Sequence, residues 1–330
     1  MNSLGVIYGT GDGVSKDLEK AYRYYKRAAE LDYKVAQYNL GFRYYLGEGV
    51  EKNLERAAEW FEKSAKQGYP SAQNKLGKMY RDGEGVQKAA IVAYKWFRRA
   101  AEQDHPQAQN NLAIAYYDGS GVKENARKAY RWFTKSAKLG NDVAQYNLAM
   151  RYYYGDGTEK DFAKARKWFA ESAEQGDLDS QYELAMMYLT AKGGGKDTPK
   201  AIDLLVKSAA QGKEDAISEL FWQYLLEGDV AKAQELKESL EAAPKTMLSL
   251  MRLGHFNAVS KNSDGALGLY KKALKSASDS GTFWENFDAS FKRLEAKELV
   301  SDSHKSYVKK LKLPDGFLKA APLKPKEPES

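Results

Sequence analysis

The sequence predicts an all-α solenoid built from stacked antiparallel helix pairs in 36-residue repeats. Three observations support this fold class: a leucine that recurs every 36 residues, a second set of alanine and aromatic positions with the same step, and glycines between the two sets. A single helix pair cannot bury such an apolar face alone. The repeats must therefore stack on one another to form a continuous core.

The first helix of each repeat carries the recurring leucine. A glycine or alanine follows this leucine in six of the seven repeats, and a tyrosine stands four residues after it. The leucines are Leu4, Leu40, Leu76, Leu112, Leu148, Leu184 and Leu220. The small residue should let a second helix approach closely, and a glycine pair such as Gly47 and Gly49 predicts the turn that follows.

The second helix of each repeat is marked by Ala57, Trp60, Phe61 and Ala65, whose spacings place them on one helical face. An Asp or Asn precedes most of these helices and predicts an N-cap, while a glycine such as Gly68 predicts the end. We expect both aromatic residues of the pair to fill the space between neighbouring repeats. The other pairs are Trp96 and Phe97, Trp132 and Phe133, and Trp168 and Phe169.

Six such repeats occupy residues 1–212. The first is truncated, because Met1 falls one place after the position equivalent to Ala36. We therefore expect an upstream segment, such as a cap, a lipoprotein signal or another repeat. Without it, the compartment stays open between the cytoplasm and the periplasm or secretion.

The later part of the chain departs from this pattern. The step from the leucine to the alanine of the second helix shortens from 17 residues to 13, which predicts two degenerate tetratricopeptide-like helix pairs in residues 213–281. We expect C-terminal capping helices in residues 282–312. The prolines and lysines of residues 313–330 predict a disordered tail.

The composition argues against most kinds of chemical site. The chain has no cysteine, which excludes disulfides, thiolate metal sites and a cysteine nucleophile. Its three histidines, His105, His255 and His304, lie far apart in the sequence and predict exposed or capping residues. We predict no enzyme activity, no cofactor and no metal. No run of 18 apolar residues occurs, so we predict no membrane span.

The repeat resembles a known family. The pattern is Ala36…Leu40-Gly41…Tyr44…Gly47-Glu48-Gly49-Val50…Ala57…Trp60-Phe61…Ser64-Ala65…Gly68, and it is similar to the Sel-one-like repeat over about residues 1–212. The resemblance implies a right-handed superhelix whose first helices line the concave side, and an adaptor role. It supplies no shared catalytic residues. Some bacterial members are immunity proteins, and many secreted members pair cysteines, which this chain lacks.

The candidate partner-binding residues lie on the first helices, two before, two after, and five or six after the leucine. They are Tyr38, Phe42, Tyr45, Lys78, Arg81, Tyr117, Tyr146, Met150, Tyr153, Tyr154, Tyr182 and Met186. Aromatic and methionine side chains exposed along a concave strip indicate a protein-binding groove. The alternative is that these side chains pack between adjacent first helices.

These observations predict a monomeric, non-enzymatic scaffold that binds another protein, whose identity the sequence does not give. One alternative is an immunity protein that neutralises a secreted toxin. A helical-repeat nucleic-acid binder is a weaker alternative despite the net charge of +7. Such a binder needs basic residues at equivalent positions, yet Lys78 and Arg81 are followed by Ile114 and Tyr117.

Overall fold

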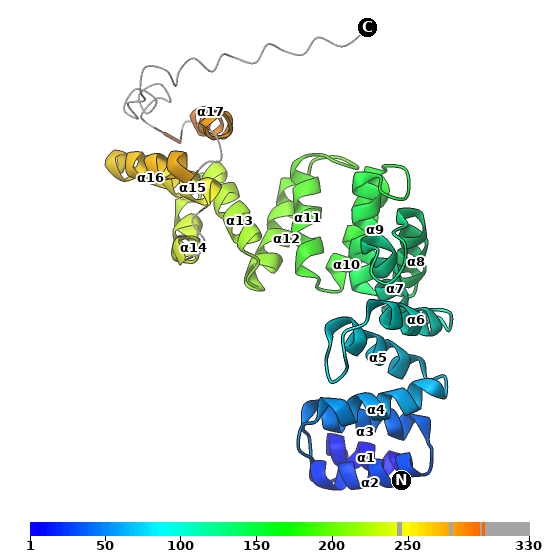
Figure 1. Ribbon diagram of the computed structural model, residues 1–330. Helices are drawn as coiled ribbons and strands as arrows, with labels where there is room; N and C mark the ends of the chain where they lie inside the picture. The colour runs from blue at the N-terminus through cyan, green and yellow to red at the C-terminus, as the bar shows by residue number, and fades with distance from the viewer. Residues whose placement is uncertain (243–245, 277–279, 298, 301–330) are drawn as a thin grey trace. The chain divides into compact units, whose positions relative to one another are not determined.

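A computed structural model of the chain describes residues 1–242, 246–276, 280–297 and 299–300 (Figure 1). Every regular element in these residues is an α-helix, which confirms the predicted all-α solenoid. The helices are α1 (Asn2–Thr10), α2 (Leu18–Glu30), α3 (Lys34–Leu46), α4 (Leu54–Lys66), α5 (Pro70–Asp82), α6 (Ala90–Ala101), α7 (Pro106–Asp118), α8 (Ala126–Lys138), α9 (Asp142–Tyr154), α10 (Phe162–Glu174), α11 (Leu178–Leu189), α12 (Thr198–Ala210), α13 (Glu214–Glu227), α14 (Val230–Ala242), α15 (Met247–Val259), α16 (Ser263–Ser276) and α17 (Ser280–Glu295).

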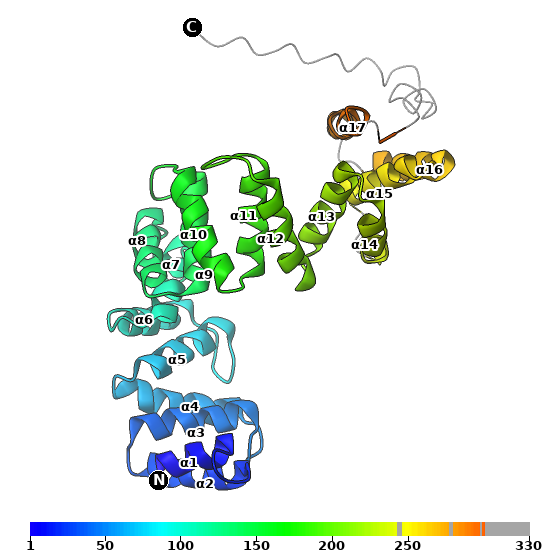
Figure 2. The same ribbon diagram turned by 180° about the vertical axis from the view of Figure 1, so that it is seen from behind.

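The helices form two compact units. The first unit holds residues 1–180 and 191–195, and the second holds residues 181–190 and the described residues from 196 onward. Within the first unit, consecutive helices lie side by side in both views (Figures 1 and 2). We call the odd-numbered helix of each pair helix A and the even-numbered one helix B. The predicted tail, and residues 301–312 of the predicted capping region, lie outside the described residues.

The glycine beside a repeated leucine brings helix A and helix B of one repeat into contact. A Cβ atom added at Gly41 would lie only 2.8 Å from the ring of Phe61. The equivalent distance from Gly77 to the ring of Phe97 is 2.6 Å. Because real Cβ atoms need more room than this, the phenylalanine of helix B lies directly on the small residue. The expected close approach is confirmed.

The predicted helix ends are confirmed in the same repeats. Asp17, Asn53, Asn125, Asp161 and Asp197 each accept a hydrogen bond from the backbone N–H three residues later. A glycine in the left-handed conformation follows helix B at Gly68, Gly140, Gly176 and Gly212. At the start of the helix the side-chain oxygen satisfies a free N–H group. At the end, glycine adopts the left-handed conformation that lets backbone N–H groups reach the free carbonyls.

The two aromatic residues of helix B do not play the equal parts that we expected. Phe61, Phe133 and Phe169 are fully buried, whereas Trp60, Trp132 and Trp168 remain partly exposed. The tryptophan precedes the phenylalanine by one residue and so points about 100° away around the helix. The Lys135 ammonium lies 4.4 Å from the ring centroid of Trp132. Of the tryptophans in this position, Trp96 is the buried one.

The second glycine of each turn sits against the preceding repeat. Gly85 has a φ of +65°, and an added Cβ would lie 2.3 Å from the carbonyl of Leu54, at the start of the preceding helix B. Gly49, Gly121, Gly157 and Gly193 approach the preceding helix B in the same way. Gly13 has the same left-handed conformation, but no atom lies within 4 Å of its added Cβ.

This difference predicts that Gly85→Ala is more destabilising than Gly13→Ala. The left-handed conformation alone should cost roughly 1 kcal/mol at either position. The backbone clash at Gly85 should add roughly 1–3 kcal/mol, because either the turn or helix α4 has to move. Urea unfolding of the two variants measures the difference. Equal losses of stability in the two variants would show that the close approach of the Gly85 turn to helix α4 does not stabilise the contact between repeats.

Candidate protein-interaction surface

The exposed aromatic residues of the predicted surface in the first unit are tyrosines at the ends of A helices. Tyr117, at the end of α7, is 39% exposed, and Tyr154, the last residue of α9, is 62% exposed. Tyr153 lies beside Tyr154, with ring centroids 5.1 Å apart. Large aromatic side chains on the surface are common anchors in protein interfaces.

A cation from the following repeat lies over the tyrosine five residues after the repeated leucine. The Arg151 guanidinium carbon lies 3.9 Å from the ring centroid of Tyr117. The Arg151 guanidinium also pairs with Asp156, at 2.8 Å from Nη1 to Oδ2. A cation over a ring face is attracted by the ring quadrupole. The arginine is therefore held in place between the ring and the carboxylate.

The same arrangement recurs at Tyr45 with different partners. The Lys75 ammonium lies 3.3 Å from the ring centroid of Tyr45, and the Tyr45 hydroxyl donates to Glu84 Oε2 at 2.9 Å. This hydrogen bond, with burial, raises the pKa of Tyr45. Burial lowers the pKa of Lys75, partly offset by the Glu84 carboxylate. Tyr45 is thereby fixed in one position.

Tyr153 is the third tyrosine at this repeat position that a cation covers. The Lys192 ammonium lies 4.8 Å from its ring centroid and donates a hydrogen bond to its hydroxyl. The ring of Phe162 lies 5.1 Å away on the same tyrosine. Sequence reasoning missed Lys75 and Lys192, because these cations come from the next repeat and stand at different places within it.

Several of the other predicted residues take part in packing. Tyr38 lies 4.8 Å from Phe42 and 5.7 Å from Phe61, measured between ring centroids, and burial raises its pKa to about 12. Phe42 also packs on Phe61, at 5.1 Å. The ring of Tyr146 lies 5.8 Å from Phe169 in the equivalent place of a later repeat. At these three positions the ring packs on helix B of its own repeat, whereas the predicted alternative was packing between adjacent first helices.

The remaining predicted residues of the first unit differ in exposure. Lys78 is exposed, and Met150 is partly exposed. Arg81 binds its neighbour Asp82 through two hydrogen bonds of 2.8 and 2.9 Å. Hydrogen bonding to Asp82 raises the pKa of Arg81 and lowers that of the carboxylate. The charge of Arg81 is therefore largely compensated by its neighbour.

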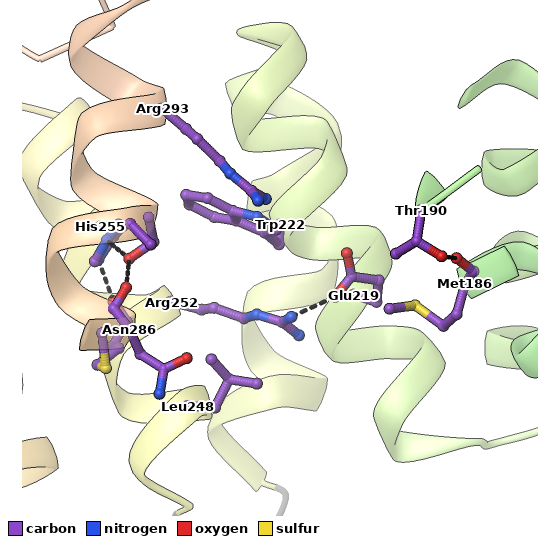
Figure 3. A pocket seen from close by; sticks show the side chains of 12 residues that line it. Met186, Thr190, Glu219, Trp222, Leu248, Arg252, His255, Asn286 and Arg293 are labelled. Atoms are coloured by element: carbon purple, nitrogen blue, oxygen red, sulfur yellow. Dashed lines mark hydrogen bonds and ion pairs between the residues drawn. The ribbon is translucent and has the colours of Figure 1, made fainter. Parts of the chain in front are cut away.

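The last two predicted residues belong to the second unit. Tyr182 is partly buried, which raises its pKa to about 12, and the Lys213 ammonium lies 5.8 Å from its ring centroid. Met186 lines a pocket of about 300 Å³ that is bordered by α11, α13, α15 and α17 (Figure 3). We did not expect this pocket from the sequence. The other residues that line it are Thr190, Glu219, Trp222, Leu248, Met251, Arg252, His255, Asn286, Ala289, Ser290 and Arg293.

A buried ion pair forms one side of the pocket. Figure 3 shows Arg252 of α15 reaching towards Glu219 of α13, to which it donates a hydrogen bond. Arg252 also donates to Ser218, and Glu219 accepts from Gln223 at 2.8 Å. Both charges are thus paired and hydrogen-bonded, as a buried pair requires to offset its desolvation.

His255 lies in the wall behind the pocket and corrects our expectation. It is 1% exposed, with the rings of Trp222, Tyr270 and Phe291 around it. Its Nδ1 donates to the carbonyl of Met251 at 2.7 Å, which leaves Nε2 as the acceptor beside Ser290 Oγ at 2.8 Å. Burial, with a smaller effect of Arg252, lowers its pKa to about 3. His105, in contrast, caps α7 as expected, and His304 lies outside the described residues.

This histidine predicts that the second unit loses stability in acid. An unfolded histidine takes up a proton below about pH 6.5, whereas the folded His255 stays neutral down to about pH 3. Stability is therefore lost as the pH falls from 6.5 towards 3, by about 2 kcal/mol at pH 5. Urea unfolding at pH 7.5 and pH 5 measures this loss. His255→Gln should remove most of it. His105→Gln should not, because His105, whose pKa burial also lowers, lies in the first unit; equal losses in all three proteins would contradict the assignment.

The described residues give no support for a metal site or a membrane span. No group of three or more His, Asp or Glu side chains among them is placed to hold a metal ion. None of the helices that the structure describes combines the length and the apolar character needed to cross a lipid bilayer. The arrangement offers aromatic anchors, paired charges and the pocket beside Met186.

The comparisons with known proteins agree on the type of repeat. The model of the Sel1 repeat family matches residues 1–33, 34–69, 70–105, 106–141, 142–177, 178–213 and 248–278. The last of these ranges lies within the region that we assigned to degenerate tetratricopeptide-like pairs. Among proteins of curated function, none matches the sequence significantly.

Two solved structures resemble this chain in sequence as well as in fold. One is c5321, a protective antigen present in uropathogenic Escherichia coli strains and displaying an SLR fold, with 33% identity and a TM-score of 0.76. The match covers 94% of this chain and 66% of c5321, just under two thirds of that protein. The other is a Sel1 repeat protein from Oxalobacter formigenes, with 32% identity, a TM-score of 0.62, and coverage of 68% of this chain and 87% of that one.

Proposed function

Because this chain belongs to the Sel1 repeat family, we propose that it is a non-enzymatic scaffold that binds a protein partner on its A helices. Proteins of this family generally mediate protein–protein interactions and are generally not enzymes. The observation that carries the proposal is the pair of exposed tyrosines, Tyr117 and Tyr154, at the ends of α7 and α9. Their aromatic surface is available for a partner, whereas the core of each repeat is already filled.

The tyrosine–cation pairs support the same surface. Tyr45, Tyr117 and Tyr153 are each held by a cation from the next repeat, so that binding orders few additional side chains. Rigid aromatic anchors lose little conformational entropy when they bind, and this loss is one of the main costs of association. The narrower role of a toxin-neutralising immunity protein remains a prediction that the partner's identity would test.

The experiment compares two double variants, each of which replaces two exposed large side chains by alanine. Tyr117→Ala with Tyr154→Ala changes the A helices, and Ile91→Ala with Leu139→Ala changes the exposed side and end of B helices. We expect the tyrosine variant to retain at most about a tenth of the partner that co-purifies with the wild type from native cells, as anchor residues do. The control variant should retain it, and both should unfold as the wild type does. Equal retention by the two variants would overturn the proposal.

A further inference from the structure

The pocket of the second unit has the form of a recognition site for a side chain. Met186, Trp222 and Leu248 form apolar walls. The Arg252–Glu219 pair forms a side with two opposite charges and no net charge. A volume of about 300 Å³ lies at the lower end of the range of ligand pockets. It is suited to one or two side chains rather than to a large cofactor.

Arg293 gives the pocket a net positive charge. Glu219 and Arg252 compensate each other, whereas Arg293 is exposed and forms no ion pair within the described part of the chain (Figure 3). A free guanidinium at the edge of an apolar pocket binds carboxylates well, because it can donate two parallel hydrogen bonds. The pocket therefore combines an apolar site with an adjacent site for one negative charge.

We propose that this pocket binds a segment of the partner protein in which an apolar side chain lies next to an Asp or Glu. The apolar side chain would enter between Met186, Trp222 and Leu248, and the carboxylate would pair with Arg293. This inference rests on the proposed function and specifies the chemistry of the partner. The selection of the partner would then depend on this pocket in the second unit, apart from the exposed tyrosines of the first unit.

Charge argues against the two occupants that this protein could supply itself. Residues 301–330 of the chain contain seven lysines against four Asp and Glu residues. A second copy of the chain would carry the same net charge of +7. Both would bring positive charge to a positive site, and like charges at an interface select against a partner. An acidic segment of a different protein matches the charge.

The test is a selection of random dodecapeptides displayed on phage against the immobilised full-length chain. Three proteins are compared: the wild type, Arg293→Glu, and the control Lys271→Glu, which makes the same charge change on exposed α16 away from the pocket. The wild type and the control should enrich peptides with Leu, Ile, Met or Phe beside Asp or Glu. Arg293→Glu should lose the acidic preference and bind a synthetic consensus peptide at least about 10-fold more weakly.

Each other outcome has a definite meaning. The proposal fails if the wild type enriches no such motif, or if Arg293→Glu enriches the same motif. It also fails if a synthetic peptide of residues 313–330 displaces the consensus peptide, since the occupant is then the chain's own tail. A wild-type dimer that Arg293→Glu dissociates would assign the pocket to a second copy. If the motif is absent but the Tyr117 and Tyr154 variant still loses its partner, the proposed function stands without this pocket.

Discussion

Phe133→Ala should lower the free energy of unfolding by roughly 3–5 kcal/mol, the usual loss when a buried aromatic side chain is removed. Phe133 is 2% exposed and occupies the helix B position whose equivalents, Phe61 and Phe97, lie on the small residue of helix A. The cavity would open between helices α7 and α8, which pack against each other. Urea unfolding followed by circular dichroism measures the loss.

The neighbouring tryptophan is the matched control. Trp132 is partly exposed and stacks with Lys135, so that Trp132→Ala should cost less, roughly 1–2 kcal/mol, which is typical of a destabilising substitution at a half-buried position. The two changes remove aromatic rings from adjacent residues of the same helix. A larger loss for Trp132→Ala than for Phe133→Ala would contradict the assignment of the core.

Arg252→Ala should destabilise the second unit by a similar amount, roughly 3–5 kcal/mol, because it leaves the Glu219 carboxylate buried without its cation. The effect comes from the unpaired charge and not from lost packing alone. The double variant Glu219→Leu with Arg252→Met should recover most of the loss, since apolar residues of similar size often replace a buried pair without a penalty. If the double variant is as unstable as Arg252→Ala, the two side chains stabilise the unit by their packing and not by compensating each other's charge.

Most of the fold follows from local spacing, which is why the sequence predicted it. The recurrence of Leu40 and Gly41 set the contact between the two helices of a repeat. Asn53 and Gly68 set the ends of helix B. Each of these features depends on residues within one turn or one helix pair, so that one repeat is enough to recognise it. Repetition then made the pattern unmistakable.

The candidate site was less predictable, because its contacts join different repeats. Spacing alone does not distinguish Trp132 from Phe133, since both fit an apolar face and only the neighbouring helix decides which one is covered. His255 is buried for the same reason, by rings from three other helices, α13, α16 and α17. Lys192 reaches Tyr153 from a turn in the next repeat.

The contacts of Arg252 beside the pocket differ from the equivalent contacts in the first unit, where the repeat is longer. In the first unit, asparagines of successive A helices bond each other 37 residues apart, as Asn111 does with Asn74 and Asn147 with Asn110. After the shortened turn, Arg252 takes the place of the donor and reaches Ser218 and Glu219, 34 and 33 residues earlier. The asparagine contact is thereby replaced by the Arg252–Ser218 hydrogen bond, and the ion pair with Glu219 is added to it. In the sequence, this ion pair could have been recognised from Glu219 and Arg252, which directly precede the leucines Leu220 and Leu253.

The central claim, that a partner binds along the A helices, is tested most directly by site-specific photo-crosslinking in native cells. A benzoylphenylalanine is placed at Tyr117 or Tyr154, and at Ile91 on helix B. Ile91 is 61% exposed and so at least as accessible as Tyr117, which is 39% exposed, and about as accessible as Tyr154, at 62%. The account predicts that one protein is crosslinked from both tyrosine positions and not from Ile91. Crosslinking of that protein from Ile91 alone, or equally from all three positions, would contradict it.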